Sequence, residues 1–412
     1  MNGSDAASAP DAASDRALAR VVRAESARIV ATLTKSLGNL DLAEESVADA
    51  VVEALQSWRT AGAPPNPGAW LTTAARHNAL DRLRRDVRYR QKLELLTAAP
   101  RAVSPESEMD ERLPLLFGCC HPALTAPAQL ALTLRAVCGL TTEQIARATL
   151  STPTAVGQRI VRAKRKIGAA GIPLRVPVGV ERASRLDIVL TVISVMYNEA
   201  HLVDGGDAVA DRDLADDALW LAEVVTNALP REAESFGLLS LLRFHRSREP
   251  ARSLAGDMVL LADQDRSRWD AALMDQARTA LHQAAQLRSP GRWQLQAAIA
   301  ACHADAPTFA DTDWPQIVVL YDMLLAYDDS PVVRLNRAVA TGEVGRLHHA
   351  LSDVDALQGS LDRFHLWHAV RGDLLRRLGR EEEAHDAWER ARGLTANDAE
   401  RRLLGGRGAT AS

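Results

Sequence analysis

The chain has few cysteines, few aromatic residues and no long apolar run. Its 412 residues include four cysteines, whose spacing does not match the framework of a small secreted protein. The longest apolar run, residues 188–197, is too short to cross a bilayer. The first fifteen residues are small and polar and lack the basic and apolar parts of a signal peptide. These absences predict a cytoplasmic protein with a disordered N-terminal tail.

Aromatic residues make up only 4% of the chain, whereas alanine is abundant, and this composition favours helices. The length is sufficient for two to four domains with cores of their own. The net charge of −4 hides an asymmetry. Residues 1–180 hold 23 Lys and Arg against 17 acids, and residues 181–412 hold 26 against 36. The first part therefore suits a nucleic-acid partner, and the second does not.

Residues 140–167 have the pattern of a helix-turn-helix. Thr141 followed by Gln144 is a capping box, which predicts a first helix to about Thr149. Thr152 can cap a second helix that begins at Pro153, because proline suits the first helical position. This arrangement predicts a reader of duplex DNA.

The second helix of this motif has one apolar and one basic side. We expect four residues at helical spacing to face the core: Val156, Ile160, Ala163 and Ile167. Four others fall on the opposite side: Gln158, Arg159, Arg162 and Arg165. Between residues 135 and 170 there are seven Lys and Arg and one acid, an attractive charge for phosphates. The alternative is a basic helix that merely faces solvent.

Upstream lies a second pair of predicted helices with opposite charges. In residues 41–55, Val47, Val51 and Leu55 form one face, and Glu45, Asp49 and Glu53 form the other. Residues 69–92 then carry a core side of Leu80, Leu83 and Val87 and a polar stripe of Asn78, Arg82, Arg85 and Tyr89. Basic side chains beside a tyrosine and an asparagine suit the binding of a nucleic-acid strand whose bases are stacked or flipped out.

The pair Cys119 and Cys120, with His121 and Cys138, contains ligand types that zinc takes. Adjacent cysteines rarely both bind one metal, and no C-x-x-C is present. We therefore predict no metal site and assign these residues to helix packing and to a turn at residues 121–122.

The C-terminal part contains a 34-residue repeat, the tetratricopeptide (TPR) period. The offset pairs Ala338 with Gly372, Gly345 with Gly379, Ala350 with Ala384 and Val354 with Trp388. An earlier unit that matches the repeat less closely places Ile317, Tyr321 and Leu324 at equivalent positions. Stacked helix pairs of this kind form concave surfaces, which predicts a protein or peptide ligand.

A charged cluster in this part is a candidate enzyme site. It comprises Asp263, Asp265, Arg266, Arg268 and Asp270. No nucleophile with a base, metal spacing or glycine-rich phosphate loop accompanies it. We therefore expect inter-helix salt bridges here, no enzyme and no cofactor.

Residues 17–168 resemble bacterial sigma-70-family sigma factors of the extracytoplasmic-function (ECF) group. Residues 41–50 (DLAEESVADA) are similar to the segment that binds the β′ clamp helices of RNA polymerase, and residues 66–85 to the helix that melts and reads the minus-10 element. The helix-turn-helix corresponds to region 4, which reads the minus-35 element and contacts the β flap. One departure is Gly157, where the usual recognition helix has Lys or Arg.

The resemblance assigns three sets of residues. The minus-35 set is Thr154, Gln158, Arg159, Arg162 and Arg165. The minus-10 set is Asn78, Arg82, Arg85, Arg88 and Tyr89. The polymerase-binding set is Asp41, Glu44, Glu45 and Asp49.

Together with the repeat, the chain resembles the ECF subfamily with a C-terminal TPR-like extension. Segments 117–124, 263–270 and 313–316 are also similar to that subfamily. The resemblance implies an all-α fold with a region 2 domain (17–96), a linker (97–107), a region 4 domain (108–170), a second linker (171–180) and a TPR-like domain (181–405), between tails at 1–16 and 406–412. It implies a factor that binds core RNA polymerase and directs it to promoter DNA, with an extension that regulates or completes this activity. The alternative is a helical-repeat scaffold with a nonspecific nucleic-acid-binding front end.

Overall fold

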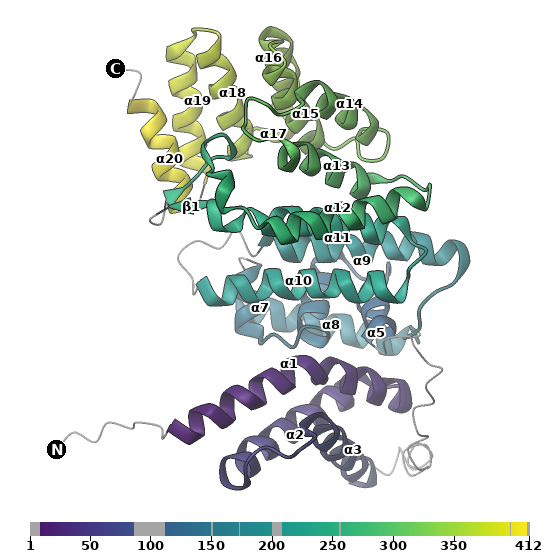
Figure 1. Cartoon of the computed structure of the whole chain (residues 1–412). Coiled ribbons are helices and arrows are strands. Elements are labelled where there is room, and N and C mark those ends of the chain that lie inside the picture. The colour runs from purple at the N-terminus through teal and green to yellow at the C-terminus, as the bar shows by residue number, and fades with distance from the viewer. Residues whose placement is uncertain are drawn as a thin grey trace, which may run out of the picture. The chain divides into compact units, whose positions relative to one another are not determined.

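The computed structural model describes residues 9–85, 112–149, 151–172, 174–199, 208–254, 257–395 and 397–409. In these ranges the protein is almost entirely helical (Figure 1), which confirms the predicted all-α class. The chain divides into two compact units, Met1–Glu199 (unit one) and Ala200–Ser412 (unit two). No helix within the described ranges is long and apolar enough to cross a membrane. The predicted linker at 97–107 lies outside the described residues.

Unit one contains eight described helices. They are α1 (Ala9–Leu37), α2 (Leu40–Ala61), α3 (Pro67–Arg85), α5 (Arg112–Cys119), α6 (Ala126–Ala136), α7 (Thr142–Ala148), α8 (Pro153–Ala169) and α9 (Gly179–Glu199). Helix α1 begins inside the segment 1–16, which was predicted to be a disordered tail.

Helix α9 spans residue 181, where the C-terminal domain was expected to begin, yet it packs against α5 and α6. Arg185 explains part of this packing. Its side chain is 3% exposed, donates a hydrogen bond to the carbonyl of Phe117 and lies 5.9 Å from the centre of the Phe117 ring. A buried guanidinium needs such partners, so Arg185 holds α9 against α5 within unit one.

Helices α1, α2 and α3 pack against one another as one module. The Asn39 side chain caps α2 by accepting a hydrogen bond from the Leu42 N–H at 3.1 Å. The Asn66 side chain does the same for α3 at the Ala69 N–H, directly before Pro67. Trp58 of α2 and Trp70 of α3 meet edge to face with ring centres 5.7 Å apart. This contact fixes the two helices that carry the candidate acidic and basic residues.

The buried face of α2 differs from the one predicted. Val47 is buried as expected, but Val51 and Leu55 are only half-buried. The buried residues of α2 include Ala43, Val47, Ala50, Ala54 and Trp58. Small alanines let α1 and α3 approach α2 closely, so the helix is rotated from the orientation that its larger apolar residues suggested.

The described part of unit two consists of helices and one pair of short strands. The α-helices are α10 (Ala208–Ala228), α11 (Ala233–Ser247), α12 (Ala271–Gln286), α13 (Arg292–Asp305), α14 (Trp314–Leu324), α15 (Pro331–Glu343), α16 (Leu347–Asp355), α17 (Gln358–Leu361), α18 (His365–Arg377), α19 (Glu381–Leu394) and α20 (Asp398–Ala409). The short elements are the 3-10 helices η2 (Glu249–Ala251), η3 (Leu261–Asp263) and η4 (Arg266–Arg268) and the antiparallel strands β1 (Ser253–Leu254) and β2 (Asp257–Met258). Consecutive helices from α11 to α20 pack mainly on their sequence neighbours.

Helices α15 and α16 are repeated 34 residues later by α18 and α19. The first helices begin at Pro331 and His365, and the second at Leu347 and Glu381. The turn inside each pair contains a glycine with positive φ, +84° at Gly345 and +76° at Gly379. Thus the two glycines that the sequence offset paired occupy equivalent turns.

The charged cluster at 263–270 is used differently from the prediction. Asp265 and Asp270 cap η4 and α12 by accepting backbone N–H groups. Arg266 donates to the carbonyls of His303 and Ala306, at the C-terminal end of α13, and its guanidinium lies 4.7 Å from the centre of the Trp269 ring. These three residues therefore bind main-chain groups at helix ends, and the inter-helix salt bridges expected for the cluster stay a prediction for Asp263 and Arg268.

Candidate nucleic-acid and protein interface

The helix-turn-helix has the boundaries that its capping residues predicted. The Gln144 side chain accepts from the Thr141 N–H at 2.8 Å, and the Thr141 hydroxyl accepts from the Gln144 N–H at 3.2 Å. This reciprocal capping box begins α7. The Thr152 hydroxyl accepts from the Ala155 N–H at 3.2 Å and caps α8, whose first residue is Pro153.

Helix α8 places its apolar and polar residues on the predicted sides. Its buried residues are Val156, Ile160, Ala163 and Ile167. Its exposed residues include Thr154, Gln158, Arg162 and Arg165. Arg159 is half-buried, with Nη1 3.3 Å from the Ser151 hydroxyl. The exposed side therefore presents mostly flexible cations and hydrogen-bond donors, the groups that contact phosphates and base edges.

Gly157 leaves space on this side of α8. A Cβ atom built there would lie 4.0 Å from the nearest side-chain atom, Cγ2 of Thr142, and the backbone is helical. We expect Gly157→Ala to raise the free energy of unfolding by about 0.5–1 kcal/mol, because alanine loses less backbone entropy in a helix. Urea unfolding followed by circular dichroism measures this.

The control for that substitution is Gly62→Ala. Gly62 also has open space around it, but its φ is +79°, so a side chain strains the backbone there. We expect Gly157→Ala to raise the free energy of unfolding and Gly62→Ala to lower it. A destabilised Gly157→Ala protein with normal α8 helicity would contradict this account.

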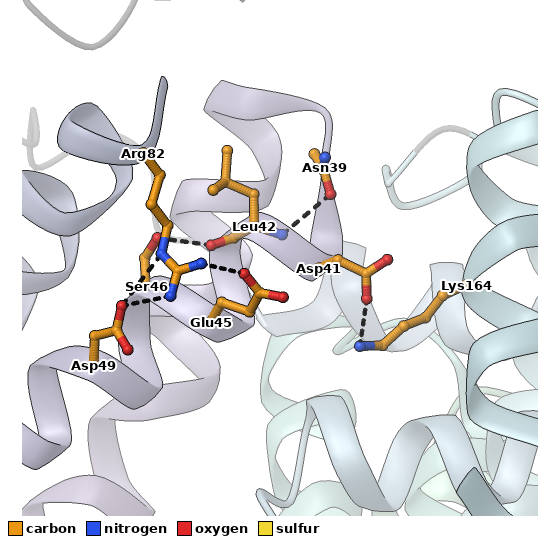
Figure 2. Close-up of polar contacts among 8 residues, drawn as sticks. All are labelled: Asn39, Asp41, Leu42, Glu45, Ser46, Asp49, Arg82 and Lys164. Atoms are coloured by element: carbon orange, nitrogen blue, oxygen red, sulfur yellow. Dashed lines mark hydrogen bonds and ion pairs between the residues drawn. The ribbon is translucent and has the colours of Figure 1, made fainter. Parts of the chain in front are cut away.

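The polar stripe of α3 and the acidic face of α2 contact each other. Arg82 of α3 donates from Nη2 and Nε to Asp49 at 2.7 and 3.2 Å and from Nη1 to Glu45 (Figure 2). Its hydrogen bond to Asp49 raises the pKa of Arg82 above its usual value. Asn78 donates to Glu53 at 2.9 Å. Two sets that the sequence assigned to different partners are thus adjacent.

The remaining residues of the minus-10 set are not all described. Arg85 is the last residue of α3, and Arg88 and Tyr89 lie outside the described residues. The predicted core residues Leu80 and Leu83 are buried, while Val87 also lies outside.

Lys164 of α8, which was not among the predicted site residues, contacts the other half of the acidic set. Its Nζ lies 2.7 Å from Asp41 and 2.6 Å from Glu44, both on α2. Figure 2 shows the contact with Asp41. Lys164 belongs neither to the buried row of α8 nor to the exposed basic row. That intermediate position was the available signal in the sequence.

Cys119 and Cys120 are buried as helix-packing residues. Burial raises the pKa of both thiols, that of Cys120 to about 12, so neither is a thiolate near neutral pH. The Cys120 sulfur lies 3.6 Å from the Thr133 hydroxyl, and His121 Nδ1 accepts from the Ala123 N–H in the predicted turn. No group of side chains suited to a metal ion occurs within the described ranges.

Three families match successive parts of the chain. Sigma-70 region 2 matches residues 21–89, and sigma-70 region 4 matches residues 115–167. The chain belongs to the sigma-70 family of sigma factors. A family of unknown function (DUF6596) matches residues 185–285 of this sigma factor. The presence of regions 2 and 4 supports core RNA polymerase and promoter DNA as its partners.

A relative is similar to most of the length of this chain. An uncharacterized protein of Rhizobium meliloti (strain 1021) is 41% identical over 381 residues, which cover 89% of each chain. The likeness therefore includes the helical extension as well as the two sigma regions. No solved structure matches the sigma factor.

Proposed function

We propose that the protein is an ECF-type sigma factor that binds core RNA polymerase through α2 and recognises promoters through α3 and α8. The observation that carries the proposal is the basic, exposed side of a capped recognition helix, in a chain where region 2 precedes region 4. By its resemblance, α8 reads the minus-35 element through Thr154, Gln158, Arg159, Arg162 and Arg165. Region 2 reads the minus-10 element through Asn78, Arg82, Arg85, Arg88 and Tyr89.

The extension is proposed to be a TPR-like domain that regulates or completes initiation. Its support is the 34-residue offset of two helix pairs and the equivalent turn glycines. The tight approach of α18 and α19 also fits, because a Cβ atom at Gly372 would lie 2.5 Å from the Trp388 ring nitrogen. Helix pairs of this type bind protein or peptide segments, which is the ligand class proposed here.

Run-off transcription with start-site mapping tests the proposal. Purified full-length protein is added to core polymerase on a library of promoter fragments, beside a chain that ends at Glu199 and keeps α9. Defined start sites that depend on the full-length protein support a sigma factor. DNA binding without defined starts would favour the scaffold alternative. If the shorter chain gives the same amount of run-off transcript, the extension has no role in initiation.

Arg162→Ala is expected to weaken binding to the upstream element by about 1–3 kcal/mol, roughly 5- to 150-fold in Kd, if the guanidinium reads a base edge. Arg162 is exposed on the basic side of α8. The measurement is Kd for the selected promoter and for versions mutated in the upstream element.

Lys166→Ala provides the control, since Lys166 is exposed on the same helix and donates to the Ala123 carbonyl. If only Arg162→Ala loses the difference in Kd between the selected promoter and its mutated versions, Arg162 reads a base edge. An equal loss on every sequence would instead make Arg162 a phosphate contact.

A further inference from the structure

A cavity of about 570 Å³ lies in unit one, between α6, α8 and α9. Its walls are mainly apolar and include Leu130 and Ala131 of α6 and Ile188, Val192 and Val195 of α9. Volumes of roughly 300–1,000 Å³ with mainly apolar walls and a few polar groups are typical of sites for small molecules. The cavity therefore has the size and lining of a ligand site.

Helix α9 supplies one wall of this cavity, although it lies outside the part of the chain that matches sigma-70 region 4. That match ends at residue 167, whereas α9 spans Gly179–Glu199 and enters the matched family of unknown function at residue 185. Helix α9 packs against α6, and its Val192 is buried between them. Region 4 without α9 would lack this wall, so the cavity depends on the first helix of the extension.

The cavity contains one charged side chain, that of Arg159. Three other polar side chains line it, and Gln129, Thr149 and Thr191 each donate a hydrogen bond to a main-chain carbonyl. Arg159 is half-buried, and its described partner is the Ser151 hydroxyl, 3.3 Å from Nη1. Within the described ranges no carboxylate pairs with Arg159. Its guanidinium is therefore a cation with unused donors at an apolar cavity.

We propose that the cavity binds a small carboxylic acid with an apolar body. The carboxylate pairs with Arg159, because a guanidinium and a carboxylate form strong, directional hydrogen bonds. The apolar body packs against α6 and α9 and leaves water. A fully hydrated ion such as free phosphate suits these walls poorly, because it would lose hydration without gaining enough partners.

The position of Arg159 gives ligand binding a consequence for DNA. Arg159 belongs to the proposed minus-35 set, and a guanidinium that holds a carboxylate is not available to a base edge or a phosphate. A bound acid therefore lowers the affinity of α8 for the upstream element. This consequence rests on the proposed function, whereas the ligand site itself does not.

Isothermal titration calorimetry on the full chain tests the site. The probes are octanoate and octan-1-ol, which have apolar chains of the same length but differ in charge. We expect octanoate to bind about tenfold or more tightly than octan-1-ol, because a hydrogen bond to a charged group contributes this much. Arg159→Gln should remove the preference. Arg162→Gln removes the same charge from an exposed position of α8 that does not line the cavity, and should keep it.

Filling the cavity tests where the acid binds. Ala126 lines the cavity from an exposed position at the start of α6, so Ala126→Trp should block octanoate without lowering the melting temperature. Val195→Phe fills the cavity from the half-buried side of α9 and should act alike. Ala169→Trp, at the exposed end of α8, is the control and should bind octanoate as the parent does.

Two results would overturn the site. One is octanoate binding at the parent level in Arg159→Gln, or in both variants that fill the cavity. The other is a parent that binds none of octanoate, hexanoate and benzoate, because these acids share the charge and differ in the size and shape of the apolar body.

Fluorescence anisotropy with a duplex that carries the upstream element tests the effect on DNA. Saturating octanoate should raise Kd about fivefold or more, the effect of losing one specific contact, and octan-1-ol should leave Kd unchanged. Arg159→Gln should bind the duplex more weakly than the parent and not respond to octanoate. Octanoate binding with an unchanged Kd for DNA would overturn the consequence while the site stands. A parent that binds no promoter duplex would overturn the proposed function, and calorimetry would still decide the site.

Discussion

Replacing Trp388 with alanine will destabilise the C-terminal unit by about 3–5 kcal/mol, the usual loss for a buried tryptophan. Trp388 is 1% exposed and lies in a cluster with Leu374, Leu375 and Ala384. Its ring fills the space left by the missing side chain of Gly372, on the adjacent helix. Alanine would leave a cavity that two helices and their backbone cannot close. Urea unfolding followed by far-ultraviolet circular dichroism measures the effect on this unit.

Leu366→Ala is the matched control for that substitution. Leu366 lies on α18, which packs against α19, but it is 45% exposed, so its truncation should change stability by less than about 0.5 kcal/mol. A loss below about 1 kcal/mol in Trp388→Ala would mean that the α18 and α19 pair is not held by this ring. The 34-residue repeat would then lack the packing reason proposed for it.

The local parts of the structure were predictable because their causes lie within a few residues. The capping box at Thr141 and Gln144 and the cap at Thr152 are decided by side chains three residues from the groups that they bind. The turn glycines Gly345 and Gly379 are similar, because their positive φ is a local requirement. These features gave the bounds of α7 and α8 and the spacing of the repeated helices.

Features that depend on how helices cross were not predictable from periodicity. In α2 the buried positions include Ala43, Ala50 and Ala54, whose small side chains give almost no apolar signal. The stronger signal of Val51 and Leu55 pointed to a neighbouring face. Periodicity ranks the faces of one helix, but the close packing of α1 and α3 selects the face that admits them.

The contacts of the candidate site show the same limit. Arg82 and Asp49 are 33 residues apart, and Lys164 and Asp41 are 123 residues apart. Charge patterns identified the acidic and basic faces separately, yet nothing within either segment specifies that they meet. The attachment of α9 to unit one through Arg185 and Phe117, 68 residues apart, has the same origin.

Asp49→Arg is expected to weaken the affinity for core polymerase by about 2 kcal/mol or more, roughly 30-fold in Kd, because it places a cation where the partner binds an anion. Asp49 belongs to the proposed polymerase-binding set and has no described contact with Lys164. The substitution therefore tests the proposed function separately from the Lys164 contact. Core binding of the full-length protein is measured by titration of a labelled sample.

The fold should tolerate this change, and that separates a binding role from a structural one. The Asp49 side chain is 46% exposed and its partner Arg82 is 38% exposed, so losing the pair costs less than about 1 kcal/mol. Gln56→Arg adds a cation to an exposed position of the same helix and should leave core affinity unchanged. If Asp49→Arg lowers the melting temperature sharply, Asp49 acts through its pairing with Arg82. If it binds core as the parent does, α2 contacts polymerase through other residues, and Asp41 and Glu44 would lose their assigned partner.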